Sequence, residues 1–382
     1  MRALTFRAWN FRGLEHVEFS PTGVSLLAGR NAAGKTTMLK GLRLMADMVR
    51  WGLPFAVKNA GGTVAFKSIH ARSDEDVVLE LSRGPITWRL GIPVEGDAVL
   101  FNGYAETVTI NGVVALDVPR LKPTFTLQEP FIVGPVGPRT RSGRSELETL
   151  KIVKMVDEDI NDFVKFTENI RVYQKLEWSQ AISEKDDSGD AYLHASCANL
   201  VPLLRDWRLS PRTGLRRYQW VLSRLQLAFP GVCEDIEITP DGRAWILDPN
   251  AADPESRIPL QLAASGFITG LLQLVALAGA APGSLICFDE VENQLHPHAI
   301  RVLIQAMRDI SEERDLTIIL TTHSPVVMNE FKDREDHFFV IEADTPPPVP
   351  KCIEELHDPN WLAHFSLGDL YEREAFSAPK KG

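Results

Sequence analysis

The chain has 382 residues, of which 44% are hydrophobic and 24% charged, values typical of a soluble globular protein and not of a mainly disordered or fibrous one. This length suggests two or three domains, or one large interwoven domain. Asp and Glu outnumber Lys and Arg by 51 to 41, and the net charge of −10 argues against a protein that coats nucleic acid with its whole surface, although a local basic strip is compatible with it.

The N-terminal residues predict a strand, a turn and a helix in succession. The alternating run 4–9 is typical of an edge or hairpin strand, and the apolar run 24–28 is typical of a buried strand. A glycine-rich turn follows, and apolar side chains recur at helical spacing from residue 35 to 50. Arginines at positions 2 and 7 fall where a signal peptide would need an apolar core, so no export is expected.

The middle of the chain changes from β to helical character. Residues 63–118 contain short alternating runs, and Asn111-Gly112 between the last two is a strong hairpin signal, so we expect an antiparallel meander. A segment rich in Pro, Gly and Arg at 130–144 should act as a flexible connection. Residues 145–228 then read as mainly helical and polar.

The C-terminal part contains an uncharged stretch, residues 258–288, that is long enough to span a bilayer. Internal Gly, Gln and Pro-Gly residues interrupt it and two acids end it, so a buried helix, a tight turn and a central strand explain it better. The other elements that we expect here are a β segment at 234–247, a helix at 298–314, a strand at 316–320 and a last helix at 367–374.

The strongest chemical signal is the run Gly29-Arg30-Asn31-Ala32-Ala33-Gly34-Lys35-Thr36-Thr37, which matches GxxxxGK[ST]. The glycines allow backbone conformations that turn successive N–H groups inward, and these groups bind phosphate together with the positive end of the following helix. Lys35 would reach the β- and γ-phosphates of a nucleotide, and the Thr36 hydroxyl would ligate Mg²⁺. The preceding strand and following helix are the context that this mechanism requires.

A second signal is the apolar strand that ends in Asp289-Glu290. At the carboxyl edge of a parallel sheet Asp289 can hold Mg²⁺ through water, and Glu290 can orient or deprotonate the attacking water. Alone, such a strand end is also compatible with a solvated loop acid, but the phosphate loop favours the catalytic interpretation.

A third signal is Thr322-His323-Ser324-Pro325, directly after the strand at 316–320. A lone histidine is usually structural, but at this strand end His323 can bond the γ-phosphate and report its presence.

These motifs resemble the ABC-type ATPase heads of the structural-maintenance-of-chromosomes (SMC), RecF and overcoming-lysogenization-defect (OLD) class, and especially compact bacterial ATP-binding proteins of the AAA family. The motifs that carry the resemblance are an opening "NFRGL" at 10–14, Ser265-Gly266 at the signature position, the acidic block 289–297, the THSP at 322–325 and a closing LGDLY at 367–371. It implies an α/β fold: a P-loop head with a mixed central sheet, an antiparallel β meander and a helical insertion lobe.

The resemblance also implies how the head works. Two copies would sandwich two ATP molecules, with Ser265 and Gly266 of one copy at the γ-phosphate held by the other. Glu292-Asn293 would lie at this seam, and Gln128 is the best candidate for the glutamine that contacts Mg²⁺. The sequence departs from the family at Phe267, where Gly or an acid is usual, so the trans contact should be weaker and turnover slow.

The resemblance divides the chain into an N-terminal half of the head (1–130), a helical lobe (131–228), a C-terminal half of the head (229–345) and a tail (346–382). The interval between the phosphate loop and Asp289 is too short for a long coiled-coil arm once the meander is subtracted. The segment after His323 is too short for the nuclease domain of OLD-type proteins. Any nuclease or toxin chemistry should therefore belong to a separate effector protein.

Two other features remain open to more than one interpretation. The basic clusters Arg139, Arg141 and Arg144, and Arg205, Arg208, Arg212, Arg216 and Arg217, suit either a nucleic acid backbone or a salt-paired surface. His296 and His298 do not share a helix face and no acid or thiol completes a metal site, so we favour a structural role.

The sequence thus predicts a cytoplasmic ATPase that uses ATP and Mg²⁺, with Lys35, Glu290 and His323 as catalytic residues and no contact with a membrane. A phage-defence or toxin-linked system is the context that small relatives suggest. The alternatives are an ATP-bound scaffold with incidental hydrolysis and a DNA-binding repair ATPase. The preference for ATP over GTP comes from the resemblance alone.

Overall fold

The computed structural model describes residues 2–118 except 97 and 102, 126–127, 158–174, 176, 189–341 except 240, 254 and 255, 349–373 and 376. The predicted connection at 130–144 lies outside these residues, and so do Gln128, Arg139, Arg141 and Arg144.

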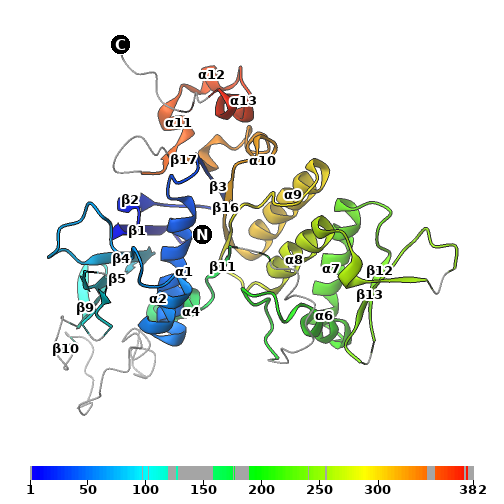
Figure 1. Cartoon of the computed structure of the whole chain (residues 1–382), viewed down its shortest axis with the longest axis horizontal. Coiled ribbons are helices and arrows are strands. Elements are labelled where there is room, and N and C mark those ends of the chain that lie inside the picture. The colour runs from blue at the N-terminus through cyan, green and yellow to red at the C-terminus, as the bar shows by residue number, and fades with distance from the viewer. Residues whose placement is uncertain are drawn as a thin grey trace.

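A six-stranded mixed sheet forms the centre of the molecule, in the order β11-β15-β16-β3-β17-β18 (Figure 1). The first five strands run parallel, and β18 is antiparallel to β17 at one edge. β3, from the start of the chain, pairs between β16 and β17, which come from its last third. The strands are β3 (Val24–Gly29), β11 (Arg171–Tyr173), β15 (Leu285–Phe288), β16 (Thr317–Thr322), β17 (Phe338–Ile341) and β18 (Lys351–Cys352).

A seven-stranded antiparallel sheet lies beside the central one, in the order β10-β9-β8-β5-β4-β1-β2. Asn111 and Gly112 join β8 to β9 with φ of 51° and 78°, the left-handed conformations of a tight hairpin turn, as predicted. The strands are β1 (Leu4–Phe11), β2 (Leu14–Phe19), β4 (Val77–Arg83), β5 (Ile86–Ile92), β8 (Ala105–Ile110), β9 (Val113–Val118) and β10 (Thr126–Leu127).

The meander begins later than predicted. Within residues 63–76 the only β pairing among described residues is a single bridge between Phe11 and Lys67. The charged run 72–76 explains the late start, because Arg, Ser, Asp and Glu fit a half-buried strand poorly. Smaller β units add to the main sheets: β6 (Val94–Glu95) with β7 (Ala98–Val99), and β12 (Asp235–Ile238) with β13 (Ala244–Leu247) and β14 (Arg257–Pro259).

Helices cover both faces of the central sheet (Figure 1). On β3, Leu27 packs into the core that includes α1 and the antiparallel sheet, whereas Leu26 and Ala28 pack into the core formed by α6 to α9. This alternation follows from the pleat of a strand that is buried on both faces. The helices are α1 (Lys35–Trp51), α2 (Leu53–Asn59), α4 (Glu158–Glu168), α6 (Leu200–Leu209), α7 (Thr213–Ala228), α8 (Ser265–Gly279), α9 (Pro297–Arg314), α10 (Pro325–Asn329), α11 (Ile353–Leu356), α12 (Pro359–Leu362) and α13 (Leu367–Glu372).

The uncharged stretch 258–288 forms the buried helix α8, a turn and the central strand β15, as predicted. Across the described residues, no helix combines the length and the apolar character needed to traverse a bilayer. The predicted fold class is confirmed, since a phosphate loop joins a central mixed sheet to α1, next to an antiparallel meander and a group of helices.

One short strand interrupts the region 145–228, which the sequence pattern predicts as mainly helical. Residues 171–173 form β11, which pairs in parallel with β15 and so belongs to the central sheet. Three residues are too few to produce a detectable alternation, and only the pairing with β15 defines them as a strand.

Because Leu26 is fully buried in the middle of the central sheet, we expect Leu26→Ala to lower the free energy of unfolding by about 2–5 kcal/mol. The matched variant Leu227→Ala alters a leucine that is 54% exposed on α7 and should change stability by less than about 0.5 kcal/mol. Chemical denaturation of the two variants checks this; equal effects would contradict the layered core described above.

Candidate functional site

The loop between β3 and α1 adopts a conformation that requires its small residues. Gly34 and Ala32 have φ of 102° and 64°, and a Cβ on Gly29 would collide with the carbonyl oxygen of Ile341. At Gly34 a Cβ would lie 2.8 Å from a methyl group of Leu14, so the start of β2 packs on the loop. No side chain of the described residues caps the N-terminus of α1. Its first-turn N–H groups therefore face the loop as anion-binding donors.

Lys35 is almost fully buried beneath this loop. Its Nζ donates to the carbonyl oxygens of Gly29 at 2.5 Å and Arg30 at 3.0 Å. Burial lowers the pKa of Lys35 to about 8, against the opposing effect of the Asp289 and Glu290 carboxylates. An anionic phosphate beside the ammonium would stabilise its charged form. The loop thus holds a cation at its centre by backbone oxygens alone.

Asp289 connects three segments that are distant in sequence. Its carboxylate accepts from the Thr36 hydroxyl at 2.9 Å and from the Thr321 hydroxyl at 2.5 Å. Its own N–H donates to Tyr173 O at 2.9 Å. These contacts bring together α1 and the ends of β16 and β11 at one edge of the sheet. Thr36 and Asp289 present oxygen ligands of the type that Mg²⁺ prefers.

Glu290 lies one residue beyond, in a constrained backbone position. Its φ is 51°, in the left-handed region, and its N–H donates to Thr321 Oγ1 at 2.9 Å. One hydroxyl therefore bonds both acidic residues and fixes the turn after β15. The Glu290 side chain is 55% exposed, so its carboxylate is accessible to water.

His323 follows β16 and faces the same site. The ring nitrogen Nε2 lies 4.0 Å from Glu290 Oε1, and the backbone N–H of His323 donates to Glu292 Oε1 at 2.8 Å. Burial and the nearby charge of Lys35 lower the pKa of His323 below its usual range, although three carboxylates oppose this. The imidazole is therefore neutral at pH 7 and can donate one hydrogen bond.

The structure thus brings together the loop 29–37, Asp289, Glu290 and His323, as the order of the motifs predicts. Glu292, which the resemblance places at a seam between copies, bonds the His323 backbone of its own chain. Gln128 lies outside the described residues.

Ser265 and Gly266 form the N-terminus of α8, on the other side of the loop that follows Glu290. Ser265 is exposed, and a Cβ on Gly266 would lie 2.5 Å from the carbonyl oxygen of Gln294. Farther along α8, Gln273 Nε2 donates to Val291 O at 2.8 Å. Helix α8 is therefore held against the loop that follows Asp289 and Glu290.

Gln174 is the residue that sequence reasoning misses. It follows β11 directly, and with Asp289, Glu290 and Gln273 it lines a cavity of about 40 Å³. Its Nε2 is buried without a hydrogen-bond partner among the described residues, and so is Gln273 Oε1. A cavity of this size has room for water, which would pair both atoms. The sequence feature that could have indicated Gln174 is Val172-Tyr173, two strand-forming residues directly before the glutamine.

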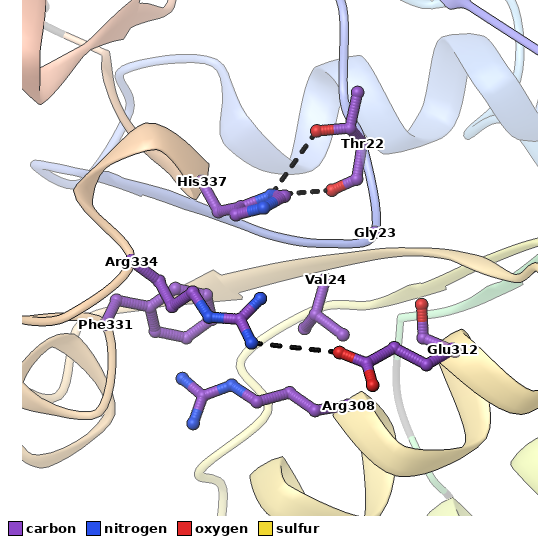
Figure 2. A pocket seen from close by; sticks show the side chains of 9 residues that line it. Thr22, Gly23, Val24, Arg308, Glu312, Phe331, Arg334 and His337 are labelled. Atoms are coloured by element: carbon purple, nitrogen blue, oxygen red, sulfur yellow. Dashed lines mark hydrogen bonds and ion pairs between the residues drawn. The ribbon is translucent and has the colours of Figure 1, made fainter. Parts of the chain in front are cut away.

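A second cavity, of about 170 Å³, lies away from the site (Figure 2). It is lined by residues at the amino end of β3, whereas the phosphate loop follows the carboxyl end of the same strand. Figure 2 shows the ion pair between Arg334 and Glu312 and the hydrogen bond between His337 and Thr22. The paired atoms of Arg334 and Glu312 lie 3.7 Å apart. None of the predicted site residues lines this cavity, so its larger volume does not make it the candidate site.

The second basic cluster is partly neutralised. Arg208 pairs with Asp235 at 2.8 Å and Arg205 contacts Asp206 at 3.5 Å, while Arg212 and Arg216 are exposed. His296 caps α9 by accepting from the N–H of His298, whose ring contacts Leu227 O. Both histidines thus have structural contacts at the start of α9.

Comparison with known proteins gives one family match. Residues 252–329 match a family described as "AAA domain, putative AbiEii toxin, Type IV TA system". The matched range is less than half of the chain and contains Ser265, Asp289, Glu290 and His323. It supports the resemblance to compact bacterial ATP-binding proteins of the AAA family that the motifs indicate. No curated protein matches the chain significantly.

Two solved structures are similar over most of their length. One, described as "Crystal structure of the SmcHead bound to the C-winged helix domain of ScpA", is 11% identical with a TM-score of 0.49, covering 92% of this chain and 96% of that one. The other, "SMC head domain from Thermotoga maritima", is 13% identical with a TM-score of 0.40, covering 89% of this chain and 95% of that one.

We expect Thr321→Val to lower the free energy of unfolding by about 1–3 kcal/mol, because the Glu290 N–H loses its acceptor and Asp289 Oδ1 loses one of its two donors. Thr317→Val, at the other end of β16, removes a hydroxyl for which no contact is described and should be near neutral. Thermal and chemical denaturation of both variants measure the difference, and a Thr321 variant as stable as the Thr317 one would refute the bridging role.

Proposed function

We propose that the protein is a Mg²⁺-dependent ATPase of the ABC type, in which two copies enclose ATP and control a separate effector protein in the cytoplasm. The observation that carries the proposal is the convergence of the loop 29–37, Asp289-Glu290 and His323 at one sheet edge. A phosphate-binding loop, two acids and a histidine that converge at one sheet edge meet the geometric criteria for a phosphoryl-transfer site.

The residues of the site fit a magnesium-bound triphosphate. The uncapped N-terminus of α1 and the buried Lys35 ammonium provide positive charge, and Thr36 and Asp289 provide oxygen ligands. ATP supplies the phosphoanhydride bond that is broken, and Mg²⁺ neutralises phosphate charge when it is bound. Gln174 has a side chain suited to the glutamine role for which Gln128 is the sequence candidate.

Glu290 and His323 have different roles at the reacting phosphate in this proposal. The exposed Glu290 carboxylate accepts a proton from the attacking water, and Thr321 holds the backbone from which this side chain extends. The neutral His323 ring donates a hydrogen bond towards the γ-phosphate. Lys35 attracts the phosphates and stabilises the charge that develops on them.

The exposed Ser265 at the end of α8 supports a site completed by a second copy. A hydroxyl at a helix N-terminus is a good phosphate ligand, and Ser265 has no hydrogen-bond partner among the described residues. The family description names a toxin of a toxin–antitoxin system, which supports a role in controlling an effector. A defence-type system is accordingly the setting that we propose.

We expect Glu290→Gln to reduce hydrolysis by about 10²–10⁴-fold while ATP binding is kept, because the amide cannot accept the proton from water. ATP should then trap the dimer, which light scattering after size exclusion detects. Glu313→Gln, an exposed change on α9, is the matched control. Undiminished hydrolysis would exclude Glu290 as the base, and unchanged effector control without hydrolysis would favour an ATP-bound scaffold.

Ser265→Arg should abolish ATP-dependent dimerisation without preventing the monomer from binding ATP, because a bulky cation replaces the small hydroxyl at the proposed seam. The measurements are nucleotide titration and light scattering, with Ser223→Arg on α7 as a matched exposed control. If the Ser265 variant dimerises as well as the control, the seam does not include α8.

A further inference from the structure

The C-terminal helix α13 is fixed against the turn that carries His323. The Gly368 N–H donates to Asn329 Oδ1 at 2.7 Å, and a Cβ on Gly368 would lie 2.8 Å from Pro325 Cβ. The Ser366 hydroxyl caps α13 by accepting from the Asp369 N–H at 3.1 Å. α13 therefore lies beside α10, which starts directly after His323 and Ser324 (Figure 1). Motion of one helix would displace the other.

This packing brings Tyr371 next to His323, the residue that we propose senses the γ-phosphate. The Tyr371 hydroxyl lies 3.4 Å from Nδ1 of His323, while Nε2 of the same ring lies 4.0 Å from Glu290 Oε1. The imidazole thus lies between the C-terminal helix and the catalytic residues, with one nitrogen towards each.

Electrostatics decide which nitrogen carries the proton. Nε2 faces a carboxylate and the proposed phosphate position, which are acceptors only, so a lone pair there would be repelled. Burial raises the pKa of Tyr371, so its hydroxyl keeps its proton and can donate. A neutral ring whose Nδ1 accepts from this hydroxyl must carry its proton on Nε2.

We propose that Tyr371 is a positioning residue that holds His323 as the Nε2–H tautomer, ready to donate a hydrogen bond to the γ-phosphate. Tyr371 itself does not touch the nucleotide; it acts through the histidine ring. The inference rests on the proposed function for its catalytic consequence. It gives α13 a direct part in how His323 responds to the γ-phosphate, because displacement of α13 would move the Tyr371 hydroxyl away from the histidine ring.

The tautomer can be read without any nucleotide. In ¹⁵N-histidine-labelled protein, two-bond ¹H–¹⁵N correlation spectra distinguish the two tautomers, and His323→Gln assigns the signal. We expect wild type to show the Nε2–H pattern for His323. Tyr371→Phe, which keeps the ring that packs near Phe376, should shift it to a mixture of tautomers. A wild-type ring protonated on Nδ1 would overturn the proposal.

Steady-state kinetics test the catalytic consequence. We expect Tyr371→Phe to lower kcat about tenfold with KM for ATP and ATP-dependent dimerisation unchanged, because only the donor to the reacting phosphate is misplaced. Tyr192→Phe removes the hydroxyl of a ring that packs against the Arg171 guanidinium, outside the site, and should leave kcat unaltered.

The two experiments separate the two proposals. Unaltered kcat and an unaltered His323 spectrum in Tyr371→Phe would overturn the positioning role. A reduced kcat with an unaltered spectrum would also overturn it, since the effect would not pass through the tautomer. The expected spectra in a protein that hydrolyses no nucleotide would support the tautomer assignment and refute the proposed ATPase activity.

Discussion

The hydrogen bonds accepted by the Asp289 carboxylate are the contacts on which the whole site depends. Thr36 and Thr321 donate to it from different elements, and its backbone N–H binds Tyr173 at the end of a third. A carboxylate placed among apolar strands is costly unless it is bonded, so these donors make the convergence energetically possible. Because Thr321 also accepts from the Glu290 N–H, the same hydroxyl determines where the proposed base lies.

Local signals in the sequence were sufficient to predict the phosphate loop, α1, the 111–112 hairpin and the helix–turn–strand unit that ends at Asp289. Each depends on neighbouring residues, such as glycines with positive φ or apolar side chains at helical spacing. β11 and the adjacent Gln174 were not predicted, because a three-residue strand is defined by pairing with β15, far along the chain. The order of motifs implied that Asp289 and His323 meet, but not that Thr321 bonds the acids.

Helix α8 is largely apolar, but its buried glutamine connects it to the loop that follows Glu290. Gln273 is buried among leucines, yet it bonds Val291 O, and Gly266 is in close contact with the backbone of Gln294. A buried amide is retained where replacing it would leave the loop carbonyl unpaired. The end of α8 proposed to meet a second copy is thus rigidly connected to the loop that holds Glu290, so the two sides of the site cannot move independently.

The place of β3 between β16 and β17 constrains how the protein is made. During synthesis β3 leaves the ribosome long before β16 and β17, with an apolar surface and two unpaired edges that these two strands later pair. The nascent chain must therefore remain in a protected or dynamic state until β16 and β17 have been synthesised. A product terminated before residue 317 would lack both neighbours of β3 and His323 itself, and nucleotide could not rescue its folding because the site could not assemble around the acids.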